Sequence, residues 1–220
     1  MTDSWTAVHV SHQQFYLLDA GLGDTGFGAE ETDYSNGLIV VMPRGAKIHT
    51  GIYAGNVRVQ ARPLPGPPEQ LDPGPWEEIV EASVYSATGR LAVEIPFPDT
   101  YPDTYLQLPE LAEAGPGWYR LRAYARGRDT ALKDVREDPV EDYLLLCWPA
   151  EQAPTRMIRT TDHCGQQLRS SAARHSARPR TAPASGMVDA ERARQQILSD
   201  NLRRRGAQRP FRRLGSPPQQ

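Results

Sequence analysis

The chain has 220 residues, of which 39% are hydrophobic, and its formal net charge is −2. This length is sufficient for one domain with a hydrophobic core of its own. No apolar run approaches the roughly 18 residues that a membrane-spanning helix requires, and residues 1–12 contain an acid but no basic stretch. We therefore expect neither a membrane anchor nor a secretory signal, and a cytoplasmic location.

The small net charge hides a strong asymmetry along the chain. Residues 1–154 contain 23 Asp and Glu against 11 Lys and Arg, a net charge of about −12, whereas residues 155–220 contain 4 against 14, about +10. Such asymmetry indicates an electrostatic role for at least one part of the chain. The simpler alternative is that an acidic surface is ordinary for a soluble cytoplasmic protein.

Short strand-like segments follow one another through residues 1–160. The 20 prolines and 18 glycines interrupt the chain too often for long helices. Alternating or continuous apolar stretches bounded by turn residues predict strands. These stretches lie at residues 13–19, 37–42, 48–59, 76–85, 91–95, 118–126 and 141–148. We expect a mainly β fold, an acidic antiparallel β-sandwich over residues 1–160.

Two of these strands are expected to pair as a hairpin. Residues 76–85 and 91–95 both alternate between apolar and polar side chains, and the turn-like sequence Ser86-Ala87-Thr88-Gly89 separates them. The proline-rich stretch Pro63–Pro75 predicts a rigid loop before this hairpin.

The composition changes in residues 161–220, which we interpret as a basic, low-complexity tail. Residues 166–186 are rich in Arg, Ser, Ala and Pro and have almost no large apolar side chains, so we expect them to be disordered. Residues 189–205 have good helix propensity, with acids early and arginines late, and predict a short helix. The arginines of the tail are the candidate nucleic-acid contacts: Arg203, Arg204, Arg205, Arg212 and Arg213.

Residues that could hold a metal or cofactor do not occur in a diagnostic arrangement. His9 and His12 are three residues apart in a predicted strand, where their side chains point to opposite faces. His163-Cys164 lacks a second pair at the spacing of a zinc site. Residues 21–28 contain the spacing G-x-G-x-x-G, but an acidic stretch follows rather than a helix, so a flexible loop explains them. We expect no metal, no cofactor and no catalytic site.

The two cysteines do not indicate a disulfide framework. Cys147 lies in the apolar run 141–148, where we expect it to pack as a small hydrophobic residue.

Three carboxylates gather at the start of the strand 76–85. Glu77, Glu78 and Glu81 could in principle form an acid/base pair. A solvated strand face is the simpler interpretation, and on an acidic domain it offers a surface to a basic partner. We therefore predict these three residues as the partner-binding face.

The strand 118–126 places Arg120, Arg122 and Arg126 on one face, among aromatic residues. One interpretation is a basic stripe for nucleic acid. The interpretation that we favour is pairing with nearby acids of a neighbouring strand, such as Glu137, Asp138, Glu141 and Asp142.

The order of the predicted strands resembles that of the competence protein J family. The resemblance rests on a first strand that ends in an aromatic residue at Val10–Phe15, the apolar strand Gly37–Val41, the segment Trp76–Ile95 with its Thr88-Gly89 turn, and the strand Gly117–Tyr124. It covers roughly residues 5–150 and implies a β-sandwich that inhibits a DNA-entry nuclease by binding it. No inhibitory residue can be carried over position by position.

Two hypotheses follow. In the first, the acidic domain is a non-enzymatic protein-binding module that inhibits a basic partner such as a nuclease, since complementary charge speeds association. In the second, the protein associates with nucleic acid through its arginine-rich tail, which lies outside the resemblance.

Overall fold

The computed structural model describes residues 5–19, 33–72, 74–95 and 108–176, which belong to one compact unit, Met1–Ala177. The expected mainly β fold is confirmed. The strands are β1 Thr6–Ser11, β2 Gln14–Asp19, β3 Ile39–Met42, β4 Gly45–His49, β5 Ala54–Pro63, β6 Glu78–Ser86, β7 Leu91–Glu94, β8 Gly117–Arg126, β9 Val135–Arg136, β10 Asp142–Pro149 and β11 Arg156–Thr160, and helix α1 is His163–Ser176.

Several predictions concern residues outside the described part of the chain. They are the glycine-rich residues 21–28, the predicted helix 189–205 and the five tail arginines 203, 204, 205, 212 and 213. In the described part, no helix has the length and apolar character needed to cross a membrane.

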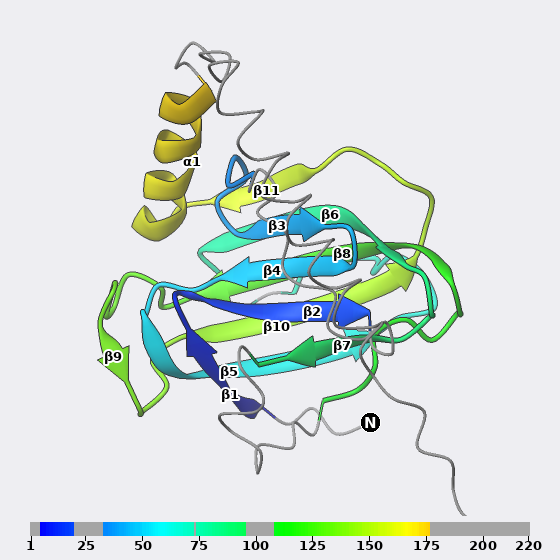
Figure 1. Ribbon diagram of the computed structural model, residues 1–220, viewed down its shortest axis with the longest axis horizontal. Helices are drawn as coiled ribbons and strands as arrows, with labels where there is room; N and C mark the ends of the chain where they lie inside the picture. The colour runs from blue at the N-terminus through cyan, green and yellow to red at the C-terminus, as the bar shows by residue number, and fades with distance from the viewer. Residues whose placement is uncertain (1–4, 20–32, 73, 96–107, 177–220) are drawn as a thin grey trace, which may run out of the picture. The chain divides into compact units, whose positions relative to one another are not determined.

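The strands form one curled, mixed sheet (Figure 1). Its order is β11-β6-β8-β10-β5-β1-β2-β4-β3, with β7 beside β2 and β9 beside β5. Most neighbours are antiparallel, but β5 runs parallel to both β10 and β9. The expected all-antiparallel sandwich is therefore corrected to a single mixed sheet that bends back on itself.

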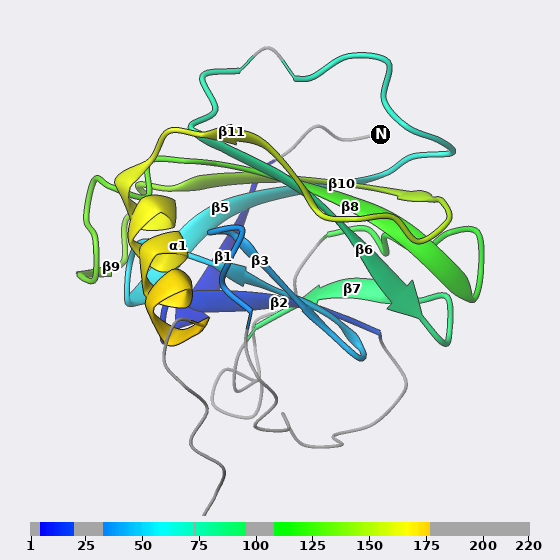
Figure 2. The same cartoon turned by 90° about the horizontal axis from the view of Figure 1, so that it is seen from above.

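The curl produces two facing layers with the main core between them. Figure 2 shows β5, β6, β8 and β10 in one layer and β2, β3 and β7 in the other. The core takes the alternate side chains of each strand, as the period of two requires. In β8 these are Tyr119, Leu121, Ala123 and Ala125. Burial of such surface contributes about 25 cal/mol per Å² and is the main stabilising term of the fold.

A smaller core covers the outer face of the first layer. It contains Trp76, Ile79, Tyr124, Leu144, Leu146 and Trp148, with Leu64 of the proline-rich loop packed against it. Strand β10 is therefore buried on both faces, which explains its continuous apolar sequence. The buried Cys147 faces the main core, as expected for a small hydrophobic residue.

The predicted hairpin between residues 76–85 and 91–95 is wrong. Strand β6 pairs with β8 and β11, whereas β7 crosses to the other layer and pairs with β2. The cause lies at the end of β2, where the Asp19 carboxylate accepts hydrogen bonds from the Ser86 hydroxyl (2.8 Å) and from the backbone N–H groups of Ala87 (2.6 Å) and Thr88 (3.1 Å). These contacts hold the connection against β2 and direct β7 toward it.

Helix α1 contradicts the expected disorder for residues 166–176. Its N-terminus is capped by two carboxylates, because Asp129 accepts the N–H groups of His163 (2.7 Å) and Cys164 (2.8 Å), and Asp162 accepts that of Gly165 (2.8 Å). Such caps satisfy the free donors of a first helical turn. Hydrogen bonds to Asp129 and Asp162 therefore help to hold this segment as a helix. The prediction of disorder considered only its lack of large apolar side chains.

Candidate functional site

The three glutamates predicted as a partner-binding face do not form an exposed face. Glu78 is 0% exposed and Glu81 is 5% exposed, while Glu77 is half-buried and accepts the N–H of Gly127 at 2.8 Å. The expectation of a solvated face is therefore wrong for Glu78 and Glu81. The predicted partner contact through these two residues is corrected with it, because both carboxylates are enclosed by arginines of the same chain.

Glu81 lies between two arginines of the neighbouring strand β8. Its Oε1 is 2.8 Å from Nε of Arg120, and its Oε2 is 2.8 Å from Nη2 of Arg122. Burial tends to raise the pKa of Glu81, but the hydrogen bonds from both guanidinium groups outweigh burial and hold the pKa below its usual value. Arg120 also donates to the carbonyl oxygens of Ala153 (2.8 Å) and Pro154 (2.7 Å), so this cluster fixes the segment that leads into β11.

A second buried cluster connects helix α1 to the sheet. Arg128 is 0% exposed and forms a two-pronged ion pair with Asp162, with Nε to Oδ2 at 2.6 Å and Nη2 to Oδ1 at 2.9 Å. The carboxyl group of Glu78 on β6 accepts a hydrogen bond from the guanidinium of Arg169 on α1 and lies 3.8 Å from Arg128. Burial, and then the hydrogen bond and negative charge of Asp162, raise the pKa of Glu78 to about 8, so its carboxyl group is protonated at neutral pH.

The arginines of β8 do not form a basic stripe for nucleic acid. Arg126 pairs with Asp142 of β10 at 2.6 Å, which confirms the favoured pairing for this residue. Arg120 and Arg122 pair with Glu81 of β6 instead of the acids after residue 136, because β8 lies between β6 and β10. Arg122 also lies over the ring of Trp148, 5.1 Å from its centroid. All three guanidinium groups are thus engaged within the domain.

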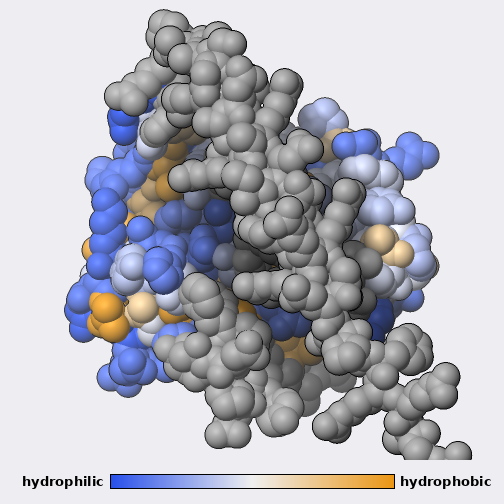
Figure 3. Space-filling model, in the orientation of Figure 1, coloured by the Kyte–Doolittle hydropathy of each residue, from blue (hydrophilic) through white to orange (hydrophobic). Residues whose placement is uncertain are grey.

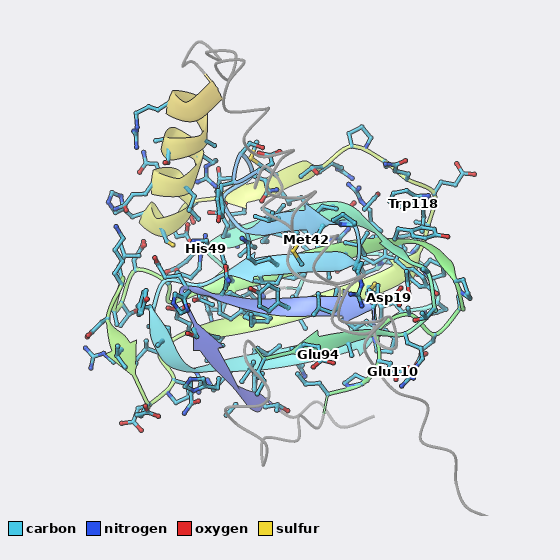
Figure 4. The ribbon with its side chains drawn as sticks, in the orientation of Figure 1. Asp19, Met42, His49, Glu94, Glu110 and Trp118 are labelled. Carbon is cyan, nitrogen blue, oxygen red and sulfur yellow. The ribbon has the colours of Figure 1, made fainter. Side chains whose placement is uncertain are left out.

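Several exposed apolar side chains gather around one cavity of the sheet. Val41 and Met42 of β3 and Pro43 of the following turn, with Tyr85 of β6 and Trp118 of β8, line this cavity of about 440 Å³. We call these five residues the aromatic groove. Figure 4 labels Met42 near the middle of the view and Trp118 farther from the helix. Val41, Tyr85 and Trp118 remain 45%, 40% and 37% exposed, which is unusual for side chains of this size.

The strand register holds the two aromatic rings of the groove together. Tyr85 and Trp118 are directly paired across β6 and β8, and their ring centroids are 5.3 Å apart in an edge-to-face arrangement. This geometry is favourable for aromatic pairs and fixes both rings without burying them. The result is a rigid, preformed apolar surface.

Acidic side chains lie beside this groove. The backbone N–H of Ala150 donates to the carbonyl of Trp118 at 3.2 Å, so the exposed Glu151 follows directly beside β8. Glu113 is exposed in the segment that leads into β8. Arg44, in the β3–β4 turn, is half-buried and already in contact with another group. The exposed Arg90, five residues after Tyr85, is paired with Glu110, so Glu113 and Glu151 are the exposed charges near the groove for which the described residues give no ion pair.

The alternation expected over residues 76–85 does not by itself find the groove. The groove combines residues from three separate strands, and the sequence alone does not bring β3 next to β6 and β8. The available signal was Trp118, a large apolar residue at the polar start of a strand.

Metal-binding and thiol chemistry find no support in the described ranges. No three His, Cys, Asp or Glu residues within these ranges are grouped so as to hold a metal ion. Both cysteines are free and buried, and burial raises the pKa of Cys147 to about 12 and that of Cys164 to about 11. Both side chains are therefore thiols at neutral pH, not nucleophilic thiolates.

No protein-family model and no curated protein matches this chain. Among solved structures, a protein described as "Crocagin biosynthetic gene J" is similar at 12% sequence identity and a TM-score of 0.38, over 69% of this chain and 100% of that chain. A likeness of this size carries no argument about function.

Proposed function

We propose that the β domain is a protein-binding module whose contact surface is the aromatic groove. The observation that carries this proposal is the exposure of Val41, Tyr85 and Trp118 around one cavity. Much of the coloured surface in Figure 3 is hydrophilic, which is the usual state of a protein surface. Tyr and Trp held rigidly at a surface are the residue types that dominate the binding energy of protein interfaces.

The occupant that fits this surface is a basic protein. Residues 1–154 have a net charge of about −12, and Glu113 and Glu151 are exposed beside the groove. Complementary charge around an apolar centre steers association and excludes acidic competitors. Because Glu78 and Glu81 are enclosed by arginines, the groove and its neighbouring acids replace them in this proposal.

Inhibition of a nuclease is the specific form of the proposal. It is supported by the resemblance of residues 5–150 to the competence protein J family and by the basic character that nucleases share as proteins that bind phosphate. The module would act by covering the partner's nucleic-acid surface and would catalyse nothing itself.

The first test is capture of a partner by the full-length protein in two forms. A Trp118→Ser, Tyr85→Ser double variant should lose the captured protein, whereas Val135→Ser should keep it. Val135 is a matched control because it is 58% exposed on β9, away from the groove. A supporting result is a partner that mass spectrometry identifies as basic. An acidic partner, or equal capture by the double variant, overturns the proposal.

The second test separates the domain from the tail. The full-length protein and a variant with Arg203, Arg204, Arg205, Arg212 and Arg213 changed to Gln are added to the captured partner in a plasmid-degradation assay. Inhibition that persists in the arginine variant supports the domain as the inhibitor. Inhibition that disappears, together with loss of DNA retardation on a gel, supports the alternative in which the tail shields the nucleic acid.

A further inference from the structure

A second cavity lies beside helix α1. It has a volume of about 630 Å³ and is lined by the β1–β2 turn, the end of β4, the loop before β9 and one side of α1. Figure 4 shows His49 at the end of β4 next to the helix. The size is that of a site for a small molecule.

The lining of this cavity carries positive charge and no carboxylate. Its charged side chains are Lys133 and Arg174, both exposed, and its titratable rings are His49 and His163. The other polar lining groups are amides and hydroxyls, which include Gln13, Gln167 and Ser170. Residues 1–154 contain about twice as many acids as bases. A cavity lined by two cations and no acid therefore has the opposite charge to the domain as a whole.

Three acids that adjoin the lining residues in the chain or cap helix α1 are already engaged. Asp162 forms the two-pronged ion pair with Arg128. Asp129 accepts the N–H groups of His163 and Cys164, and Asp134 pairs with Arg136 at 3.1 Å. The negative charge of these carboxylates is therefore partly neutralised by groups of the same chain. The positive charge of Lys133 and Arg174 remains for a molecule that enters the cavity.

His49 offers a hydrogen-bond acceptor to such a molecule. Burial, and then the positive charge of Arg128, lower the pKa of His49 to about 4, so the ring is neutral at pH 7. Its Nδ1 lies 2.9 Å from the carbonyl oxygen of Thr50, which can only accept a hydrogen bond. Nδ1 must therefore carry the ring proton, and Nε2 is left as an acceptor for a donor group.

Residues with positive φ line the same cavity. The described non-glycine residues with positive φ are His12 (56°), Gln13 (60°) and Lys133 (64°). Two of them, Gln13 and Lys133, line the cavity. His12 and Gln13 form the two-residue turn between the paired Ser11 and Gln14, and positive φ at both positions is the ordinary geometry of such a turn. The turn fixes Gln13 at the cavity wall, opposite the positive-φ residue Lys133 of the loop before β9.

We propose that this cavity binds a small dianion, either a phosphate ester or a dicarboxylate, that also carries a hydroxyl or amine group. Lys133 and Arg174 neutralise the two negative charges. The neutral His49 accepts a hydrogen bond from the hydroxyl or amine. Gln13 and Gln167 donate from their amide groups to the anionic oxygens. The site is separate from the aromatic groove and does not depend on protein binding there.

The test is isothermal titration calorimetry of the full-length protein with inorganic phosphate and with succinate, at constant ionic strength. Binding of phosphate alone identifies the phosphorylated class, and binding of succinate alone identifies the dicarboxylates. Arg174→Gln and Lys133→Asn, each of which removes one cation, are expected to weaken binding at least tenfold. Asn is chosen at position 133 because it tolerates positive φ.

Arg156→Gln is the matched control, since Arg156 is an exposed arginine on β11 and not part of the cavity lining. This variant should bind as the unaltered protein does. Two results overturn the proposal. One is no binding of either dianion at millimolar concentration, and the other is equal affinity in Arg174→Gln, which would assign the binding to other arginines such as those after residue 177.

Discussion

At the scale of single residues, this domain buries several charged side chains in addition to those that it exposes. Arg120, Glu81 and Arg128 are each 5% exposed or less, yet each carries a formal charge or a direct ion pair. Removing two charges from water is costly, and the cost is offset only where the partners have close, multiple hydrogen bonds. Removing one charged side chain from such a cluster leaves its partner buried without a counter-charge, and this should lower the free energy of unfolding strongly.

Glu81→Gln tests this directly. It removes the negative charge between Arg120 and Arg122 while keeping the shape, and we expect the free energy of unfolding to fall by about 3 kcal/mol because two buried guanidinium groups lose their counter-charge. Urea denaturation measures the change. Glu69→Gln, in the exposed part of the proline-rich loop, serves as control and should alter the stability by less than about 0.5 kcal/mol. If both substitutions changed the free energy of unfolding equally, the buried cluster would contribute no more to stability than an exposed acid does.

The two buried thiols lead to a second expectation at this scale. Cys147 is 0% and Cys164 is 2% exposed, and the pKa of each thiol is raised by burial to about 12 and about 11. Neither should react with a disulfide reagent such as DTNB at pH 8 on the time scale of minutes. Both should react at once in concentrated guanidinium chloride. Rapid reaction of the native protein would contradict the burial of these side chains.

At the scale of secondary-structure elements, the attachment of helix α1 to the sheet depends on the protonation of Glu78. Its Arg169 binds Glu78 of β6, and the pKa of Glu78 is raised to about 8 from an ordinary value near 4.5. A carboxyl group with a raised pKa stabilises the folded state fully below its unfolded pKa and loses this contribution as the pH rises toward the folded pKa. The attachment of α1 should therefore weaken between about pH 5 and pH 8.

Glu78→Gln isolates this effect, since Gln retains the shape and polarity of the protonated carboxyl group. The free energy of unfolding of the unaltered protein, relative to that of the variant, should fall between pH 6.5 and pH 8 by up to about 1.4 kcal/mol per pH unit. His49, whose lowered pKa acts in the opposite direction between about pH 4 and pH 6.5, is present in both proteins and cancels. Parallel stability curves over this range would contradict a raised pKa of Glu78.

Some of these secondary-structure elements and their pairings could be predicted from the sequence, and others could not. Period-two alternation correctly predicted β6 and β8 as strands, and continuous apolar runs correctly predicted β2 and β10, because burial in the core leaves a direct record in the sequence. The partners of β7 and the helix α1 left no such record. Both are determined by polar contacts between residues far apart in the chain, Asp19 with Thr88 and Glu78 with Arg169.

At the scale of the whole molecule, acidic charge and the aromatic groove act at different distances. Electrostatic steering operates over about a Debye length, roughly 10 Å at 0.1 M salt and 3 Å at 1 M, whereas apolar contact in the groove begins only at touching distance. The negative charge of the domain that carries the candidate site could be predicted from the sequence, but the position of the groove could not. The negative charge can be counted from the sequence, but the cavity requires the sheet order.

The salt dependence of binding follows from this division. Association of the captured partner with the full-length protein should slow at least tenfold between 0.05 M and 0.5 M NaCl, whereas dissociation should change much less. Trp118→Ser should show the opposite pattern, faster dissociation with a similar association rate. Surface plasmon resonance separates the two rates. An association rate that is insensitive to salt would remove the electrostatic part of the proposal.

The position of β10 in the sheet has a consequence for how the protein is made. It lies between β5 and β8, near the centre of the sheet, but only β11 follows it among the strands that the structure describes. On a ribosome, the earlier strands emerge with this central place still empty, so a nascent chain leaves the backbone N–H and C=O groups along the facing edges of β5 and β8 unpaired until residue 149 has left the exit tunnel. Folding must then finish after most of the chain is synthesised, and prematurely terminated chains should aggregate and require chaperones.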